Sequence, residues 1–346
     1  MRFLYARAPH EHGGAAGRAS PSRPHDDRGR AFGQSLPLHR LQADFSGSGS
    51  GRGAEKGEHE VRSDVEYVRP ASLEETVGFL SVHGPETKPL AGGTDLLIDI
   101  RSGKCNARYI MDVTRIPELR GIVVTEEGLS VGAGATISEI ARSEEVKRYA
   151  PVLWKSCLTF GSPQVRNTAT IGGNIANASP SADTVPPLIV HEAVAVLAGP
   201  EGERRIPVEQ SAAGPNRSNV GPRELIVRFI LKPAEGGFSE FLKIGRRKAL
   251  AIARVSMAVL AERDAGGAIS FIRFCLGSCT PVACRIREVE DFLLGKIPEE
   301  TVVAEGGRLA ARKMIEISGR RPTTVYKEQA VKGLFMRLLY PMVKND

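Results

Sequence analysis

Two glycine pairs constrain this chain more than any other feature of its sequence. The first lies in Ala91-Gly-Gly-Thr-Asp-Leu96 and follows an expected strand, and the second lies in Thr170-Ile-Gly-Gly-Asn174. Paired glycines let a backbone approach a ligand closely and adopt positive φ. Successive N–H groups can then converge on an anion such as a pyrophosphate. Two such loops from distant parts of the chain could clasp one long dinucleotide from two sides.

Each glycine pair has a simpler interpretation, because a Gly-Gly step in a turn is more often only a turn. Neither segment contains the G-x-G-x-x-G pattern of dinucleotide-binding βαβ units or the G-x-x-x-x-G-K-[ST] pattern of phosphate-binding loops. The sequence therefore does not support a Rossmann or a P-loop fold. Any nucleotide site must be of another type.

Length and composition indicate a globular protein with about two domains. The chain has 346 residues, of which 41% are hydrophobic, and a net charge of +7. We expect no nucleic-acid partner, because Lys and Arg form no stripe interleaved with aromatic residues. We expect no membrane span, because no apolar run reaches the ~18 residues that a spanning helix needs. The five cysteines form no C-x-x-C pair, which favours a reducing cytoplasm over a disulfide framework.

Residues 1–60 differ from the rest of the chain. They hold five of the seven histidines and the low-complexity run Ser46–Gly53. Few apolar residues are available to offset the entropy of ordering, so we predict a disordered tail. The irregular spacing of the histidines argues against a metal site there. Val61 is a candidate for the true initiation site.

The pattern after residue 65 predicts mixed helix and sheet. Ser72 with Glu75, and Thr136 with Glu139, are capping boxes that each open a helix. Pro233–Gly237 reads as a domain boundary. The remaining elements follow from apolar periodicity: strands at 88–91 and 108–113, hairpins at 121–134 and 193–208, helices at 72–83 and 150–160, then strands at 238–244, 252–263 and 268–278 and helices at 286–295, 299–316 and 326–339.

One longer motif adds a family resemblance. Gly161-Ser-Pro-Gln-Val-Arg-Asn167 runs into Thr170–Asn174 and Ala178-Ser-Pro180, and this run resembles the FAD-binding subunit of molybdenum hydroxylases. That group includes xanthine, carbon monoxide and nicotinate dehydrogenases. The resemblance extends over about residues 65–340 and includes Phe241–Arg247 and Arg320–Lys327. The Asn-Ala-Ser-Pro version is most similar to the xanthine dehydrogenase branch.

The resemblance implies a fold and a cofactor. The fold is of the α+β class: a two-subdomain FAD-binding domain of the vanillyl-alcohol oxidase type, at 61–235 with subdomains of about 61–117 and 118–235. A small α+β domain at 236–346, with a three-stranded antiparallel sheet and helices, follows. The cofactor is FAD, bound noncovalently. The implied FAD-binding residues are Leu90, Ala91, Gly92, Gly93, Thr94, Asp95, Phe160, Thr170, Ile171, Gly172, Gly173, Asn174, Asp183, Ile226 and Lys243.

Several of these residues have an ordinary structural alternative. Phe160 could be a core aromatic, Asp183 could cap a helix before Pro186, and Lys243 could lie on a solvated strand face. Arg246, Arg247 and Lys248 form either a solvated or a partner-facing cluster. Two departures from the family pattern, Ala251 in place of Asp and a loop at 213–221 without aromatics, leave open how the flavin ring is covered.

The resemblance also implies an oxidoreductase subunit that relays electrons. A molybdenum-cofactor subunit would hydroxylate the substrate, a two-iron iron–sulfur subunit would pass electrons to FAD, and NAD⁺ or another acceptor would receive them. We nominate no general acid or base and no metal site, and we interpret Cys275, Cys279 and Cys284 as structural thiols. The alternatives are a self-sufficient flavin oxidase, an FAD-binding regulatory or assembly protein, and the FAD subunit of a CO or nicotinate dehydrogenase.

Overall fold

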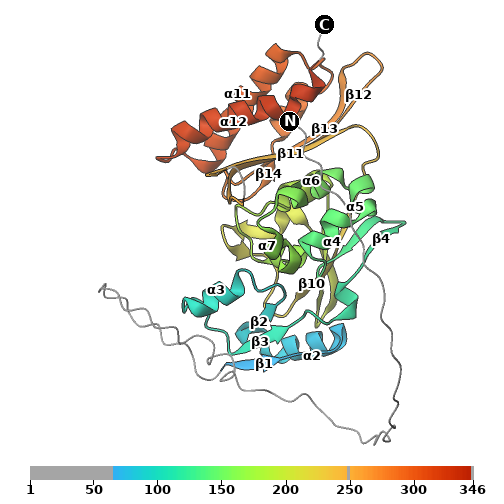
Figure 1. Cartoon of the computed structure of the whole chain (residues 1–346), viewed down its shortest axis with the longest axis vertical. Helices are drawn as coiled ribbons and strands as arrows, with labels where there is room; N and C mark the ends of the chain where they lie inside the picture. Colours follow the sequence, from blue (N-terminus) through green and yellow to red (C-terminus); the bar gives the residue numbers. More distant parts are fainter. Residues whose placement is uncertain (1–64, 248–249, 344–346) are drawn as a thin grey trace, which may run out of the picture. The chain divides into compact units, whose positions relative to one another are not determined.

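The computed structural model describes residues 65–247 and 250–343. The predicted disordered tail at 1–60, its histidines and the candidate start at Val61 lie outside the described residues, and so does Lys248. The described chain forms three larger sheets in succession, each with its own helices (Figure 1). Within this part of the chain, no helix combines the length and the apolar character needed to cross a membrane.

The first sheet is parallel and has the strand order β1-β3-β2. It consists of β1 (Glu66–Val68), β2 (Thr87–Leu90) and β3 (Tyr109–Asp112), connected through α2 (Leu73–His83) and α3 (Leu96–Arg101). The predicted start of α2 is confirmed, because the Ser72 hydroxyl accepts a hydrogen bond from the Glu75 amide at 3.1 Å. All four residues of the central strand β3 are buried. The segment Ala91–Asp95 leaves the carboxyl end of β2, the edge where parallel sheets place their ligands.

The second sheet is antiparallel, with the order β4-β5-β10-β6-β7. The predicted hairpins are confirmed as β4 (Ile122–Thr125) with β5 (Gly128–Gly132), and β6 (Val194–Gly199) with β7 (Gly202–Pro207). The sequence interpretation missed the central strand β10 (Leu225–Leu231), which joins the two hairpins. Its nearly continuous apolar run is buried on both faces and therefore lacks the alternation that marks a half-buried strand. A small pair, β8 (Ala212–Gly214) and β9 (Arg217–Ser218), lies apart from the main sheet.

Six short helices accompany this second sheet. They are α4 (Ile137–Arg142), α5 (Glu144–Tyr149), α6 (Pro151–Thr159), α7 (Pro163–Thr168), α8 (Ile171–Ala176) and α9 (Val185–Val190). The capping box at the start of α4 is confirmed, because Thr136 and Glu139 bond reciprocally. Three of these helices, α5, α7 and α8, were not predicted, and α9 was anticipated only as the helix that Asp183 could cap. Each has only six residues, which is too short to display an apolar period.

The third sheet has four antiparallel strands, where the sequence predicted three. The three long strands are confirmed as β11 (Phe238–Gly245), β12 (Ala253–Arg263) and β13 (Ile269–Gly277). The additional strand β14 (Cys284–Arg285) pairs with Cys275 and Leu276 of β13. Two residues cannot show a period of two, so this strand depends on the chain turning back after β13.

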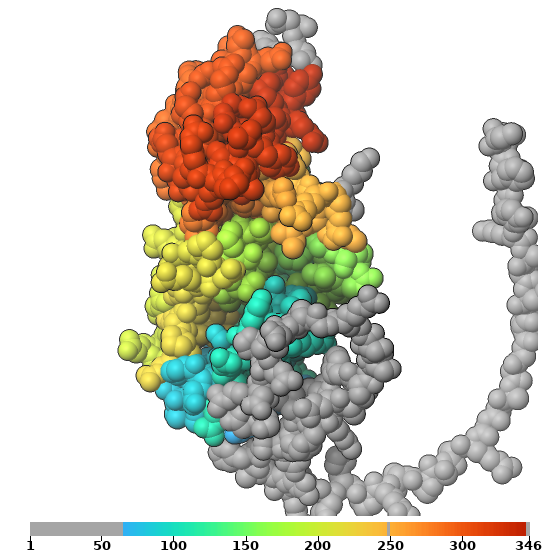
Figure 2. Space-filling view, turned by 90° about the vertical axis from the view of Figure 1, so that its left-hand side faces the viewer, coloured from blue at the N-terminus to red at the C-terminus, as the bar shows by residue number. Residues whose placement is uncertain are grey.

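Three helices cover one face of the third sheet (Figure 1). They are α10 (Arg287–Leu293), α11 (Glu300–Ser318) and α12 (Thr324–Leu339), and they confirm the three helices predicted there. The predicted apolar face of α12 is buried, with Phe335 packed edge-on against Phe274 of β13 at 5.0 Å. The other face of the sheet contacts the second region, where Lys155 of α6 pairs with Glu240 of β11 at 3.1 Å. In the space-filling view, the C-terminal region lies directly against the second region (Figure 2).

Candidate functional site

One large cleft brings both glycine segments together. Its volume is about 1020 Å³, and its walls come from the first sheet, the helices of the second region and the β11–β12 connection. All but three of the predicted site residues line it: Ala91, Gly92, Gly93, Thr94, Asp95, Phe160, Thr170, Gly172, Gly173, Asn174, Asp183 and Ile226. Leu90 ends strand β2 behind the first glycine segment, Ile171 is fully buried in the core, and Lys243 reaches the cleft only through Asp183.

The first glycine segment can present backbone donors to a ligand. Gly93 has a φ of +68°, the left-handed region that favours glycine. In the described part of the chain, the amides of Gly92, Gly93 and Thr94 have no hydrogen-bond acceptor. A Cβ on Gly92 would lie 2.0 Å from the carbonyl oxygen of Thr168. Gly92 therefore lets the first segment touch the end of α7, immediately before the second segment.

The second glycine segment has a different conformation from the one predicted. Gly172 and Gly173 lie in the first turn of α8 and not in a loop, and neither has a positive φ. The Thr170 hydroxyl caps this helix by accepting from the Gly173 amide, while the amides of Ile171 and Gly172 donate to Ala135 and Ala133. The expectation that both segments present converging N–H groups is thus wrong for the second one. It can offer a ligand the side chains of Thr170 and Asn174.

Gly172 is needed for packing. A Cβ at this position would lie 2.7 Å from the carbonyl oxygen and 2.8 Å from the Cβ of Ala133. Helix α8 therefore packs directly against Ala133, the residue that follows β5. This close approach gives the cleft a rigid wall, and it places Asn174 beside Thr184, whose hydroxyl donates to the Asn174 amide oxygen at 2.6 Å.

An ion pair closes one side of the cleft. The Lys243 ammonium, on β11, donates to Oδ2 of Asp183, and the two side chains are only 12% and 9% exposed. Burial raises the pKa of Asp183, and the nearby charge of Lys243 counteracts this effect. Oδ1 of Asp183 is buried and has no partner among the described residues. A buried carboxylate oxygen without a donor is costly, so this atom fits a ligand that brings a hydrogen-bond donor.

These positions decide between the alternatives left open by the sequence. Asp183 does not cap α9, since Thr184 holds the N-cap position and that helix has no side-chain cap. Lys243 is not on a solvated face. Phe160 combines both interpretations, because it packs against the hydrophobic core and also lines the cleft. Ile226 lies on β10 beside a register shift and is 4% exposed.

The cleft is also lined by residues that the sequence analysis did not nominate, and two groups of them lie at its edges. Lys104, Cys105 and Asn106 follow α3, and Leu250, Ala251 and Ile252 follow the β11 strand. Only Ala251 carried a signal, as a departure from the family pattern. Leu250 and Ile252 are 49% and 80% exposed, so this apolar connection stands at the open side of the cleft. Arg246 and Arg247 are exposed nearby, and the Arg247 guanidinium donates to the Leu250 carbonyl at 3.0 and 2.6 Å.

The cysteines of the last region are thiols in apolar surroundings. Cys275 and Cys279 are buried, and burial raises the pKa of Cys279 to about 12. All five cysteines of the chain are free. The described residues contain no group of three or more His, Cys, Asp or Glu side chains that could hold a metal ion.

Fold and cleft together define an α+β protein with three successive sheet regions and one cleft large enough for an extended cofactor. Comparison with known families agrees with this. Residues 63–233 match the FAD-binding domain in molybdopterin dehydrogenase, and residues 240–342 match the CO dehydrogenase flavoprotein C-terminal domain.

Individual relatives point to the same group. The xanthine dehydrogenase FAD-binding subunit of Escherichia coli O157:H7 is 32% identical over 227 residues, which cover 65% of this chain and 77% of the relative. The carbon monoxide dehydrogenase medium chain of Hydrogenophaga pseudoflava is 34% identical over 233 residues, covering 67% and 80%. The solved carbon monoxide dehydrogenase of Hydrogenophaga pseudoflava superposes with a TM-score of 0.75 at 29% identity, covering 81% of this chain and 98% of that one.

The chain belongs to the family of FAD-binding subunits of molybdenum hydroxylases. Its cofactor is FAD, and it is a component of an oxidoreductase. The family, fold and cofactor that the sequence motifs implied are thereby confirmed.

Proposed function

We propose that the twelve predicted residues that line the cleft, with Lys243 acting through Asp183, form the FAD site, and that the two glycine segments have different roles in it. The first segment binds the pyrophosphate through the amides of Gly92, Gly93 and Thr94, because these donors have no acceptor within the described chain. The second segment supports the cofactor through Thr170 and Asn174 on the rigid start of α8. The close contact of Gly92 with Thr168 carries this proposal, since it places both segments in one cleft.

The Asp183–Lys243 pair would hold the cofactor from the side of the last domain. Oδ1 of Asp183 is buried without a partner, and a hydroxyl or N–H group of FAD can donate to it. The Lys243 charge counteracts the rise in the pKa of Asp183 that burial causes, and Lys243 occupies only Oδ2, which leaves Oδ1 as the acceptor. Bound FAD supplies the exchange of one and two electrons, while the protein positions it and tunes its electronic properties.

The domain organisation follows the three sheets. We propose an FAD-binding domain at 61–235, with subdomains of about 61–117 and 118–235, and a C-terminal domain at 236–346. The cleft supports this division, because residues of all three parts line it or reach it.

For the assembled enzyme we propose a xanthine dehydrogenase-like complex in the cytoplasm. A molybdenum-cofactor subunit would act on the substrate, a two-iron subunit would deliver electrons to FAD, and NAD⁺ would accept them. Support comes from the relatives' names, and the five free thiols agree with a reducing compartment. The CO dehydrogenase medium chain is just as similar, so the FAD subunit of a CO dehydrogenase is the second candidate.

Co-purification of the complex tests this proposal. We expect the isolated chain to hold FAD but to hydroxylate neither xanthine, nicotinate nor CO, and the co-purified complex to reduce NAD⁺ with a purine. Turnover of CO in place of a purine would select the second candidate. Substrate turnover by the chain alone would establish a self-sufficient oxidase. A stable FAD complex that neither NADH nor the partner subunits can reduce would establish a regulatory protein.

A further inference from the structure

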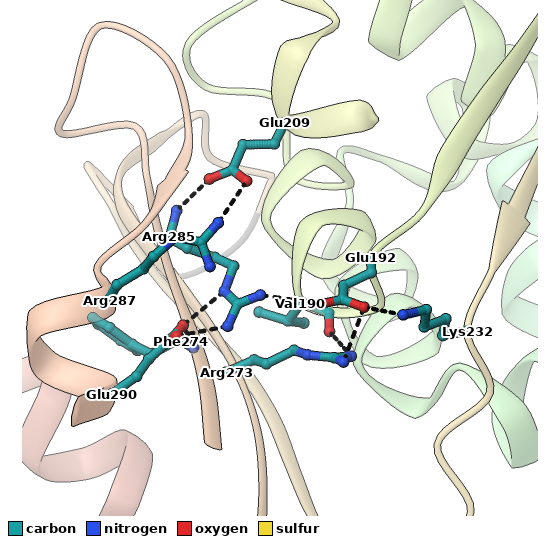
Figure 3. A network of polar contacts seen from close by, with 9 residues as sticks. All are labelled: Val190, Glu192, Glu209, Lys232, Arg273, Phe274, Arg285, Arg287 and Glu290. Carbon is teal, nitrogen blue, oxygen red and sulfur yellow. Dashed lines mark hydrogen bonds and ion pairs between the residues drawn. The ribbon is translucent and has the colours of Figure 1, made fainter. Parts of the chain in front are cut away.

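A charged cluster joins the FAD-binding region to the last domain at a distance from the cleft. Its centre is Glu192, just after α9 (Figure 3). The Glu192 carboxylate receives Arg273 of β13 at 3.0 Å, Arg285 of β14 at 3.2 Å and Lys232 at 2.5 Å. One carboxylate thus gathers two cations from the last domain and one from the FAD-binding region.

Arg273 depends on this carboxylate, and Arg285 shares it with Glu290. Arg273 and Arg285 are only 17% and 12% exposed, so their charges need partners inside the protein. Glu290 binds Arg285 through two hydrogen bonds of 2.9 and 2.6 Å, but it belongs to the same domain as both arginines. Burial alone would raise the pKa of Glu192, yet Lys232 and the two arginines outweigh burial and lower it. Glu192 is therefore an anion held among cations.

Glu192 also has an unusual backbone. Its φ is +47°, a left-handed conformation that a non-glycine residue rarely adopts. Glycine would adopt this backbone conformation with less strain, yet the chain has glutamate here. This conformation ends α9, because the amides of Glu192 and Ala193 donate to the carbonyls of Ile189 and Leu188 at 2.9 and 2.8 Å.

Helix α9 connects this cluster to the cleft. It begins two residues after Asp183 and ends two residues before Glu192, and five of its six residues are buried. The segment 180–190, which ends with α9, contacts β13 and the residue after it: the Ser278 amide donates to the Pro180 carbonyl at 3.0 Å, and Arg273 donates to the Val190 carbonyl at 3.2 Å. The last domain therefore hydrogen-bonds to the segment 180–190 at both of its ends.

The position of Lys243 depends on the same contacts between the last domain and the segment 180–190. Lys243 of β11 lies opposite Ser256 of β12, which lies opposite Gly277 of β13. These residues form one row across a hydrogen-bonded sheet. A shift of β13 along α9 would therefore carry Lys243 away from Asp183.

We propose that Glu192 is a positioning residue for the FAD site, which by binding Arg273 and Arg285 fixes the last domain along α9 and so holds Lys243 against Asp183. This inference rests on the proposed role of Asp183 and Lys243 in binding FAD. Glu192 itself does not line the cleft, so it acts on FAD only through this pair.

A double-mutant cycle on the full chain tests the proposal. FAD is removed, and its affinity is then measured by titration with FAD for wild type, Glu192→Gln, Lys243→Met and the double variant. Glu192→Gln should weaken FAD binding about fivefold, and it should have almost no further effect once Lys243 is Met, because contacting networks couple in this way. Glu203→Gln is the matched control, since Glu203 pairs with Arg228 within the second sheet and its loss should leave FAD affinity unchanged.

Each outcome decides something. If Lys243→Met weakens FAD binding and Glu192→Gln acts equally in both backgrounds, Glu192 has only a structural role and the inference fails. If Lys243→Met does not change FAD affinity, the proposed FAD site fails at this pair and the inference falls with it. Should Glu192→Gln not fold, Arg273→Lys, which keeps the charge but loses the planar fork, must show the same dependence on Lys243.

Discussion

Lys243 and Asp183 are sixty residues apart in the sequence and form a buried ion pair across the boundary between the last domain and the FAD-binding region. Asp183 lines the cleft, and its second carboxylate oxygen has no partner among the described residues. Through this pair, one side of the cleft depends on how the two domains pack together. A change at either residue should affect both stability and cofactor binding.

We expect Asp183→Asn to destabilise the protein by about 3 kcal/mol, because it leaves the Lys243 charge buried and unpaired. The double variant Asp183→Asn/Lys243→Met should recover most of that stability but not the FAD affinity. Urea unfolding and FAD titration of the three variants measure the two effects. Equal unfolding midpoints for the single and double variants would contradict the proposed coupling.

Gly92→Ala should reduce both FAD content and stability, because its Cβ would lie 2.0 Å from the backbone oxygen of Thr168. We expect a loss of about 2 kcal/mol, in the range for overpacking. Gly78→Ala is the matched control: it lies within α2, and nothing is within 4 Å of its new Cβ. That change should stabilise the helix by ~0.5–1 kcal/mol and leave FAD content unchanged. Thermal melts and flavin absorbance after purification distinguish the two.

The two glycines of the second segment should differ. Gly172→Ala brings a Cβ within 2.7 Å of the Ala133 carbonyl oxygen, whereas Gly173→Ala meets only the Thr170 hydroxyl, at 3.1 Å. We therefore expect Gly172→Ala to lower the melting temperature clearly and Gly173→Ala to change it little. Equal losses at both positions would show that the segment is constrained by something other than contact with Ala133.

Stability should fall as the pH drops below neutral, in part because of His191. This side chain is fully buried, and burial lowers its pKa from 6.5 to about 4. The unfolded chain takes up a proton near pH 6.5 while the folded chain resists it until about pH 4, so acid favours unfolding within this window. Between pH 7 and pH 5 the loss should be about 2 kcal/mol. His191→Gln should show a flatter dependence in urea unfolding, and an unchanged slope would exclude His191 as the cause.

The flavin should be bound noncovalently. Neither His83 nor His191 lines the cleft, and of the cysteines only Cys105 does. Acid precipitation of the purified chain should therefore release the yellow colour into the supernatant. Colour retained in the pellet of wild type but released from Cys105→Ser would instead identify a covalent link at Cys105.

The sequence determined the family, the cofactor and most of the regular structure by itself. The motif from Gly161 to Asp183 identified the class, and local signals were enough where they were strong. Ser72 and Thr136 opened their helices as expected, and the spacing of Val331, Leu334 and Phe335 predicted the buried face of α12. Caps and periodic faces depend on residues within one or two turns, so the sequence displays them directly.

Only the tertiary structure decided what the glycines and charges do. Gly172 is needed because α8 lies on Ala133, and the two glycine segments differ because one has its amides bonded and the other does not. The pairing of Asp183 with Lys243, and of Glu192 with Arg273 and Arg285, joins residues from separate domains. Such contacts depend on how sheets pack against each other, which involves residues sixty or more positions apart and leaves no local pattern in the sequence.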